Sequence, residues 1–383
     1  MLLKWCARRR HWLAAIYYSN QNNKPSNYKY NKYNDRQHKN RKSFVPITAS
    51  LTRLMFGCTL YVTVANAQSM ATEQSGLHHE PIQALPFPQE QNPDKLLLGE
   101  KLFKEQRLAD NNKMSCASCH DLGVNGADSR IYARGQSADA GVNTPTVFNS
   151  RFNHRLFWDG RAKTLEEQID FVIADEREFA TSWPVVVAKL KQDEDYQARF
   201  NKVYPDGITA ANIRDAIASF ERSLVTVNSR FDRYLRGDAE AINAKEKQGY
   251  QLFKNYGCIA CHQGRNVGGN LFQKLGVFKA FFYNGKALKK VDLGRFNVTG
   301  QEEDKHVFRV PSLRLVALTP PYFHDGSAKT LRDAIKVMAE YQLGRTIPEA
   351  DIQLIIAFLK TLAGEYQGRA LAGSYEEALN SER

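Results

Sequence analysis

Two stretches of the chain carry apolar residues at intervals of three and four positions, the spacing of one face of an α-helix. The first stripe comprises Ile213, Ala216, Ile217, Phe220 and Leu224, and the second comprises Ile352, Ile355, Ile356, Leu359 and Leu362. Both stripes predict amphipathic helices whose apolar faces belong to a core. The residues Thr-Ile-Pro-Glu at 346–349 predict a capping box at the start of the second helix. Strand-like alternation is scarce, so the pattern predicts a mainly α fold.

The length and composition are those of a globular protein with two domains. The chain has 383 residues, of which 43% are hydrophobic and 25% are charged. This length accommodates two domains of ordinary size. No run of about 18 uninterrupted apolar residues occurs, so the sequence contains no clear transmembrane helix.

The net charge of +12 belongs almost entirely to the N-terminal 67 residues. These hold six Lys, six Arg and one acidic residue, Asp35, whereas the rest of the chain holds 41 basic and 40 acidic residues. The basic character is therefore confined to this segment and gives no indication of a nucleic-acid partner for the folded part.

Residues 1–67 are predicted to form a leader in two parts. Residues 19–42 are rich in Asn, Lys and Tyr without an apolar period, which indicates disorder or translation from upstream of the true start. Residues 43–67 resemble a signal peptide, with an apolar stretch followed by Ala-Asn-Ala at 65–67. A short buried helix is the weaker alternative, because polar residues follow directly. Cleavage near Ala67 predicts export to the periplasm.

The four cysteines that follow the leader form two identical motifs. These are Cys116-Ala-Ser-Cys119-His120 and Cys258-Ile-Ala-Cys261-His262. The spacing suits covalent haem attachment, because two thiols add to the two vinyl groups of one haem and the following His reaches the iron. We therefore predict two haem c groups, with His120 and His262 as proximal iron ligands.

Three other kinds of site use Cys-x-x-Cys pairs. A redox dithiol does not require a following His. A four-cysteine zinc site usually brings its two pairs within about 15–20 residues, and the pairs here are much farther apart. A disulfide within each pair is compatible with an exported protein. The two complete five-residue motifs favour haem over all three.

The chain also contains an internal repeat. Gly-Glu-Lys-Leu-Phe at 99–103 precedes the first haem motif, and Gly-Tyr-Gln-Leu-Phe at 249–253 precedes the second. A segment that starts at Pro145 and contains Asp-Gly-Arg-Ala-Lys-Thr-Leu is echoed by one that starts at Pro311 and contains Asp-Gly-Ser-Ala-Lys-Thr-Leu. The proline precedes the aspartate by 14 residues in both. The repeat predicts two tandem cytochrome c-like haem domains, at residues 68–236 and 237–383 by our assignment.

These residues resemble the bacterial di-haem cytochrome c peroxidase family, which includes the MauG-type enzymes. The resemblance runs from residue 99 to about residue 362 and is most specific at 143–149, 157–161 and 318–326. It implies an enzyme that reduces hydrogen peroxide to water at the N-terminal haem. Electrons would enter at the C-terminal haem from a small c-type cytochrome or a cupredoxin. The resemblance also implies a homodimer.

Two residues near the first haem acquire roles from this resemblance. Glu178 matches the family's distal glutamate, which can move a proton between the two peroxide oxygens. Without the resemblance, a solvated acid at a helix end would be the preferred interpretation. Trp158 matches the tryptophan between the two haems, where an indole offers a path for electrons. The ordinary alternative for a tryptophan is a large core residue, and both descriptions can hold together.

Met338 is predicted to be the second axial ligand of the C-terminal haem. The other methionines after the leader are Met70, at the extreme end, and Met114, two residues from Cys116. Met338 also falls where the family places its methionine, and a thioether ligand raises the haem potential. MauG-type enzymes carry a tyrosine at this place, so Met338 favours a peroxidase.

The resemblance implies a calcium ion at the domain interface. Asn143 matches its side-chain ligand, and Thr319 and Pro321 match its backbone carbonyl ligands. Oxygen donors of this kind suit Ca²⁺.

One loop departs from the family pattern. Many members carry a second His before the Asn143 segment, and it blocks the first haem iron until the other haem is reduced. The loop at 131–141 contains no His, and Arg134-Gly135 occupies that place. His154 is nearby, but we expect it to be packed or exposed rather than bound to iron. We therefore expect a first haem that is five-coordinate or water-bound at rest.

Two other functions stay open at this point. A MauG-like enzyme that oxidises residues of a partner protein is compatible with the loop at 131–141 but not favoured by Met338. A non-enzymatic two-haem electron carrier would need both irons fully ligated, and the same loop argues against it.

Overall fold

The computed structural model describes residues 80–133, 135, 141–282 and 287–371. The leader, the signal peptide at 43–67, Met70 and Arg134 lie outside the described residues. In the described part, no helix is long and apolar enough to cross a membrane.

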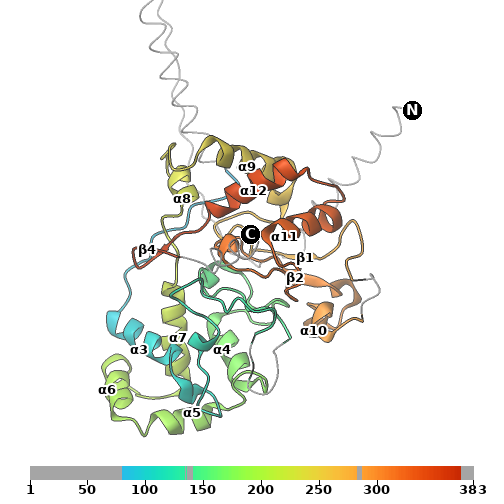
Figure 1. Cartoon of the computed structure of the whole chain (residues 1–383). Helices are drawn as coiled ribbons and strands as arrows, with labels where there is room; N and C mark the ends of the chain where they lie inside the picture. The colour runs from blue at the N-terminus through green and yellow to red at the C-terminus, as the bar shows by residue number, and fades with distance from the viewer. Residues whose placement is uncertain (1–79, 134, 136–140, 283–286, 372–383) are drawn as a thin grey trace, which may run out of the picture. The chain divides into compact units, whose positions relative to one another are not determined.

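The described chain is mainly helical, as predicted. Its first half contains α3 (Pro93–Phe103), α4 (Leu165–Ala174), α5 (Trp183–Leu190), α6 (Glu194–Val203), α7 (Ala210–Ser223) and α8 (Arg230–Leu235). Its second half contains α9 (Ala244–Asn255), α10 (Phe296–Thr299), α11 (Leu331–Val337) and α12 (Glu349–Lys360). Figure 1 shows α3 to α7 grouped together in the lower part of the view and α9, α11 and α12 in the upper part.

The strands are short and lie outside the helical cores. β1 (Phe272–Lys274) pairs antiparallel with β2 (Val307–Arg309), and Phe272 lies opposite Arg309. β3 (Glu365–Tyr366) and β4 (Arg369–Ala370) form a small hairpin near the C-terminal end of the described chain.

Both halves are built around a pair of helices that meet at a glycine. A Cβ atom on Gly99 of α3 would lie 2.1 Å from the carbonyl oxygen of Ala216 in α7. A Cβ atom on Gly249 of α9 would lie 1.9 Å from the carbonyl oxygen of Leu354 in α12. These glycines belong to the two matching pentapeptides of the sequence repeat. Their role is to let each pair of helices approach closely.

The second part of the repeat is also visible in the backbone. Phe157 and Phe323, which are equivalent in the two repeats, both adopt left-handed conformations, with φ of 66° and 71°. Thr164 and Thr330 then cap α4 and α11, because each side chain accepts a hydrogen bond from a backbone N–H in the first turn. The same local sequence therefore produces the same turn, cap and helix in both halves.

The two predicted apolar stripes face the cores. Every residue of the first stripe is buried on or just after α7, and every residue of the second is buried on or just after α12. The predicted capping box at 346–349 is wrong. Pro348 directly precedes α12 and makes no side-chain capping hydrogen bond, so Glu349 is the first helical residue and not the third residue after a Thr346 cap. The Glu349 carboxylate instead accepts a hydrogen bond from Arg332 at 2.7 Å.

Residues from before position 237 contribute to the hydrophobic core around α9, α11 and α12. Ile82 is 1% exposed and pairs with Gly264 in a parallel bridge, and Phe231 of α8 packs in the same cluster. Buried Asp232 accepts a hydrogen bond from the Leu85 backbone at 3.2 Å. The domain assignment at 68–236 and 237–383 stays a prediction.

Candidate haem sites

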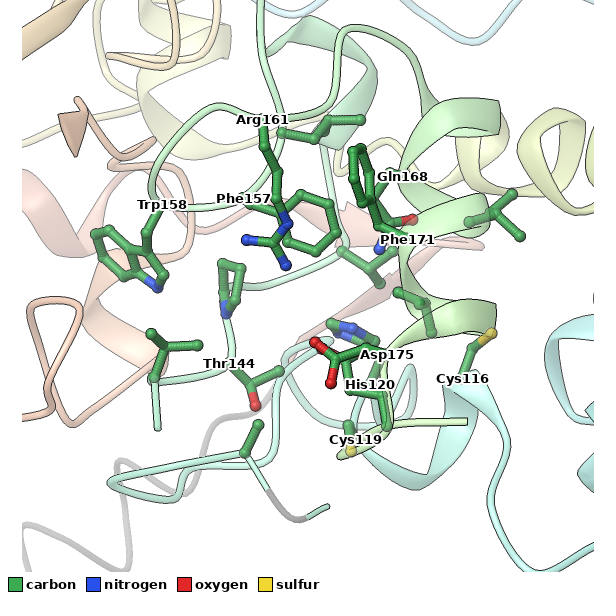
Figure 2. A pocket seen from close by; sticks show the side chains of 18 of the residues that line it. Cys116, Cys119, His120, Thr144, Phe157, Trp158, Arg161, Gln168, Phe171 and Asp175 are labelled. Carbon is green, nitrogen blue, oxygen red and sulfur yellow. The ribbon is translucent and has the colours of Figure 1, made fainter. Parts of the chain in front are cut away.

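The larger of the two cavities that contain a haem motif, about 650 Å³ in volume, is lined by the first motif. Cys116, Cys119 and His120 form part of its wall, and α4 with the turn after it forms another part. Figure 2 shows His120 together with Phe157, Arg161 and Asp175 around this space. The size and the two thiols beside an imidazole fit a covalently attached haem.

His120 is held in an orientation that suits iron binding. A 3-10 turn (Cys116–Ser118) brings the ring back toward the cavity, and its Nδ1 lies 2.9 Å from the carbonyl oxygen of Gly126. This contact fixes the ring and leaves Nε2 available for a metal. Burial lowers the pKa of His120, which favours the neutral imidazole that an iron ligand requires.

Glu178 lies in the wall of the same cavity, on a turn after α4. Its backbone N–H donates to the Asp175 carbonyl at 3.0 Å. Burial, reinforced by the negative charge of Asp175, raises the pKa of Glu178 to about 7, although Arg161 and Arg177 oppose the shift. A carboxyl group with this pKa can both accept and donate a proton near neutral pH. The local sequence alone favoured a solvated acid, and the tertiary structure places it against the cavity.

Two charged residues of this cavity were not singled out from the sequence. The Arg161 guanidinium stacks on the Phe157 ring at 3.4 Å and pairs with Asp159 at 3.0 Å, so it is held over the cavity (Figure 2). Glu221 of α7 is buried, and burial raises its pKa to about 8. Glu221 lies four residues after Ile217 and therefore on the apolar stripe of α7. This position is the feature of the sequence that indicates a buried carboxyl group.

The smaller cavity, about 250 Å³ in volume, is lined by the second haem motif and by Met338. Burial lowers the pKa of His262 to about 4, so this imidazole is also neutral. Met338 is the first residue of a π-helical turn (Met338–Gln342) that follows α11. Such turns are rare and often occur at functional sites. The structure therefore brings the predicted ligands of the second haem to one cavity.

Trp158 lines both cavities. Its indole N–H donates a hydrogen bond of 2.9 Å to the carbonyl oxygen of Asn143. Its ring meets the His324 ring edge to face, with centroids 6.4 Å apart. Trp158 is thus a partly buried residue that belongs to the walls of both cavities.

The three predicted calcium ligands lie in one region. Asn143, Thr319 and Pro321 all line the smaller cavity. The Asn143 side-chain amide donates to the carbonyl oxygen of Arg130 at 2.6 Å, which leaves its oxygen as the remaining polar end. These donors are amide and carbonyl oxygens, which are ligands that Ca²⁺ accepts. Calcium stays a prediction.

His154 lies away from the larger cavity. Its Nδ1 lies 3.1 Å from the carbonyl oxygen of Gly269, and its ring packs edge to face on Phe272. Among the described residues that line the larger cavity, His120 is the one histidine. His154 is therefore an exposed residue that contacts Gly269 and Phe272 and does not line the larger cavity, as expected.

The environment of the cysteines does not suit the alternatives to haem. Burial raises the pKa of Cys116, Cys258 (to about 11) and Cys261, whereas the reactive thiol of a redox pair has a lowered pKa. Cys116, Cys258 and Cys261 form no disulfide. Within the part of the chain that the structure describes, no three His, Cys, Asp or Glu side chains are grouped as a metal site, so a four-cysteine zinc site is absent there.

Comparison with protein families gives a match to the model for di-haem cytochrome c peroxidase over residues 93–240. The chain is 43% identical to cytochrome c peroxidase Ccp of Escherichia coli, covering 80% of this chain and 66% of that protein. It is 42% identical to cytochrome c551 peroxidase of Nitrosomonas europaea, covering 83% and 93%. The methylamine utilization protein MauG of Methylophilus methylotrophus is 33% identical, covering 71% and 83%.

A solved structure of a MauG-like protein associated with microbial copper homeostasis superposes with a TM-score of 0.65. The two chains are 29% identical, and the match covers 75% of this chain and 94% of the other. The di-haem peroxidase BthA from Burkholderia thailandensis is 19% identical, with a TM-score of 0.59, and shares the fold.

Proposed function

Because the chain belongs to the di-haem cytochrome c peroxidase family, we propose that it reduces hydrogen peroxide to water with electrons from a small redox protein. The observation that carries this proposal is the position of Glu178 in the wall of the cavity that holds Cys116, Cys119 and His120. A two-haem electron carrier has no need of a half-buried carboxyl group with a pKa of about 7 beside its haem.

The residues of each cavity fit a haem c. Cys116 and Cys119 would hold the first haem, and Cys258 and Cys261 the second, with His120 and His262 as proximal ligands. When bound, each haem supplies an iron that exchanges electrons one at a time.

In the larger cavity, Glu178 moves the protons. Its carboxylate takes a proton from one oxygen of hydrogen peroxide and returns it to the other oxygen, which leaves as water. Two electrons and two further protons complete the conversion of one peroxide molecule to two water molecules. Arg161, held by Asp159 and Phe157, keeps a positive charge at the cavity and stabilises negative charge that develops on the peroxide oxygens.

In the smaller cavity, Met338 would hold the second haem together with His262, and Trp158, which lines both cavities, would provide the path for electrons between them. Asn143, Thr319 and Pro321 would bind calcium beside Trp158, whose indole N–H donates a hydrogen bond to the Asn143 carbonyl oxygen. The donor is a small c-type cytochrome or a cupredoxin. The protein works in the periplasm after cleavage near Ala67, as a homodimer.

The decisive measurement is steady-state oxidation of reduced cytochrome c by hydrogen peroxide, with calcium present. Fully ferric enzyme is compared with enzyme pre-reduced by one electron. We expect rapid turnover by the ferric form, because no histidine besides His120 lines the larger cavity in the described residues. Turnover only after pre-reduction would keep the peroxidase and reject the open first haem.

Absence of turnover in both forms would reject the peroxidase and favour the MauG-like oxidation of a partner protein. Electron paramagnetic resonance of the ferric protein tests the resting state independently. A high-spin signal is expected for the first haem, and two low-spin signals without it would contradict the open site.

A further inference from the structure

Arg309 is a buried cation without an acidic partner among the described residues. It ends β2 and is 3% exposed. Its Nε donates to the carbonyl oxygen of Phe157 at 3.2 Å, and Nη1 lies 3.5 Å from its neighbour's carbonyl oxygen. Neither contact neutralises the charge, and an isolated buried charge is costly.

A second buried arginine, Arg314, has its positive charge neutralised by a carboxylate of the same chain. Arg314 is 1% exposed, and its guanidinium forms an ion pair of 2.8 Å with Asp232, which is fully buried. It also donates to the carbonyl oxygens of Arg265 and Gln83. The chain therefore supplies its own carboxylate for Arg314 and supplies none for Arg309 in the described part.

The position of Arg309 indicates where its counter-ion comes from. Arg309 lines both the larger and the smaller cavity, as Trp158 does, and its backbone N–H donates to the Trp158 carbonyl at 2.9 Å. Burial lowers the pKa of Arg309 to about 10, so the guanidinium is still charged at neutral pH. The other arginines of the larger cavity, Arg161 and Arg177, are paired with Asp159 and Asp175.

We propose that Arg309 is the counter-ion of a haem propionate at the place where the two cavities meet. This rests on the haem attachment proposed above. The vinyl groups are consumed by the cysteines, and the propionates stay as free carboxylates. A guanidinium presents a planar fork of donors that matches a carboxylate. Arg309 would thereby fix one edge of a haem beside Trp158 and add positive charge that favours the reduced iron.

The test compares Arg309→Gln and Arg309→Lys with Arg369→Gln, which removes one exposed charge on β4. Haem content is measured first, then the propionate bending band by resonance Raman spectroscopy and the two midpoint potentials by spectroelectrochemistry. We expect R309Q to retain two haems, to shift the propionate band to lower frequency and to make one midpoint potential more negative. R309K should shift the band and keep a potential near that of the wild type, because it keeps the charge without the fork.

An unchanged propionate band in R309Q or R309K would overturn the proposal, and so would equal shifts of potential in R309Q and R309K. If R309Q loses its haem, the proposal is tested by the propionate bending band of R309K. R369Q should match the wild type in all three measurements. A wild-type protein with fewer than two haems per chain would contradict the proposed haem attachment. That result is distinct from failure of the proposed contact between Arg309 and a propionate.

Discussion

The two haem cavities are bordered by equivalent helices of the sequence repeat but differ in volume and in lining residues. The larger contains Glu178, Asp175, Arg161 and Arg177 beside the first haem motif, whereas the smaller contains Met338 and mainly apolar residues beside the second. The equivalent helices α4 and α11 border the two cavities. α4 ends in a turn that carries carboxylates, and α11 continues into a π-helical turn that carries a methionine. The different ends of these equivalent helices thus place Glu178 at one cavity and Met338 at the other, which matches the different roles that we propose for the two cavities.

The largest effect should come from removing the first haem alone. The double substitution Cys116→Ser and Cys119→Ser removes both thiols that attach it, so haem content should fall from two to one per chain. Peroxidase activity should be lost, while the midpoint potential of the second haem should be nearly kept. Haem quantification and redox titration check this. Loss of both haems would show that the two cavities do not form independently.

The next largest effect is expected at Glu178. Glu178→Gln removes the proton acceptor but keeps the size of the side chain, and general acid–base groups contribute about 10²–10⁴-fold to rate. We expect a loss in that range for the reaction with peroxide, measured by stopped-flow spectroscopy. Glu176→Gln, an exposed neighbour, is the matched control and should react like the wild type. A loss below tenfold in E178Q would argue against the proton-transfer role.

The pH dependence follows from the same carboxyl group. Its pKa is raised to about 7, so Glu178 is protonated below this pH and cannot accept a proton from peroxide. The rate of the peroxide reaction should therefore rise about tenfold per pH unit well below pH 7 and level off above it. The slope should disappear in E178Q. A wild-type rate that does not change between pH 5 and 8 would contradict this assignment.

Met338→Leu tests the ligand set of the smaller cavity. Leu is close to Met in volume, so the packing should cost less than about 1.5 kcal/mol, but the thioether is lost. The midpoint potential of the second haem should fall by on the order of 0.1 V, a fraction of the ~0.8 V range that axial ligands span. Redox titration measures this. The resting spectrum of the first haem should not change, and an unchanged second potential would remove Met338 from the ligand set.

The smallest effect is expected for Gly249→Ala, which should change stability alone. Gly249→Ala places a Cβ 1.9 Å from the Leu354 carbonyl oxygen, so α9 and α12 must separate, at a cost of about 1–3 kcal/mol. Thermal unfolding should show a lower Tm, while the peroxide reaction in the other half is kept. Gly99→Ala makes the same change between α3 and α7. It should lower both Tm and the peroxide reaction rate, because α7 borders the larger cavity at Ile217 and Glu221.

The sequence alone determined the features that depend on neighbouring residues. Covalent haem attachment is encoded by five contiguous residues, and the core faces of α7 and α12 follow from the spacing of their apolar residues. The repeat reappeared in the left-handed turns at Phe157 and Phe323 and in the caps of α4 and α11. The sequence predicts a cap at Thr346, whereas α12 begins after Pro348. A capping motif in the sequence does not show which residue the backbone uses as the cap.

The tertiary structure alone decided the electrostatics of the cavities. Glu178 looks like a surface acid in sequence, and its pKa depends on burial and on the charges of Asp175, Arg161 and Arg177. Arg309 and Arg314 are five residues apart in similar sequence surroundings, yet only Arg314 is paired with an acid in the described structure. Burial and charge pairing depend on residues that are distant in the chain and close in space, so they become visible only when the fold brings those residues together.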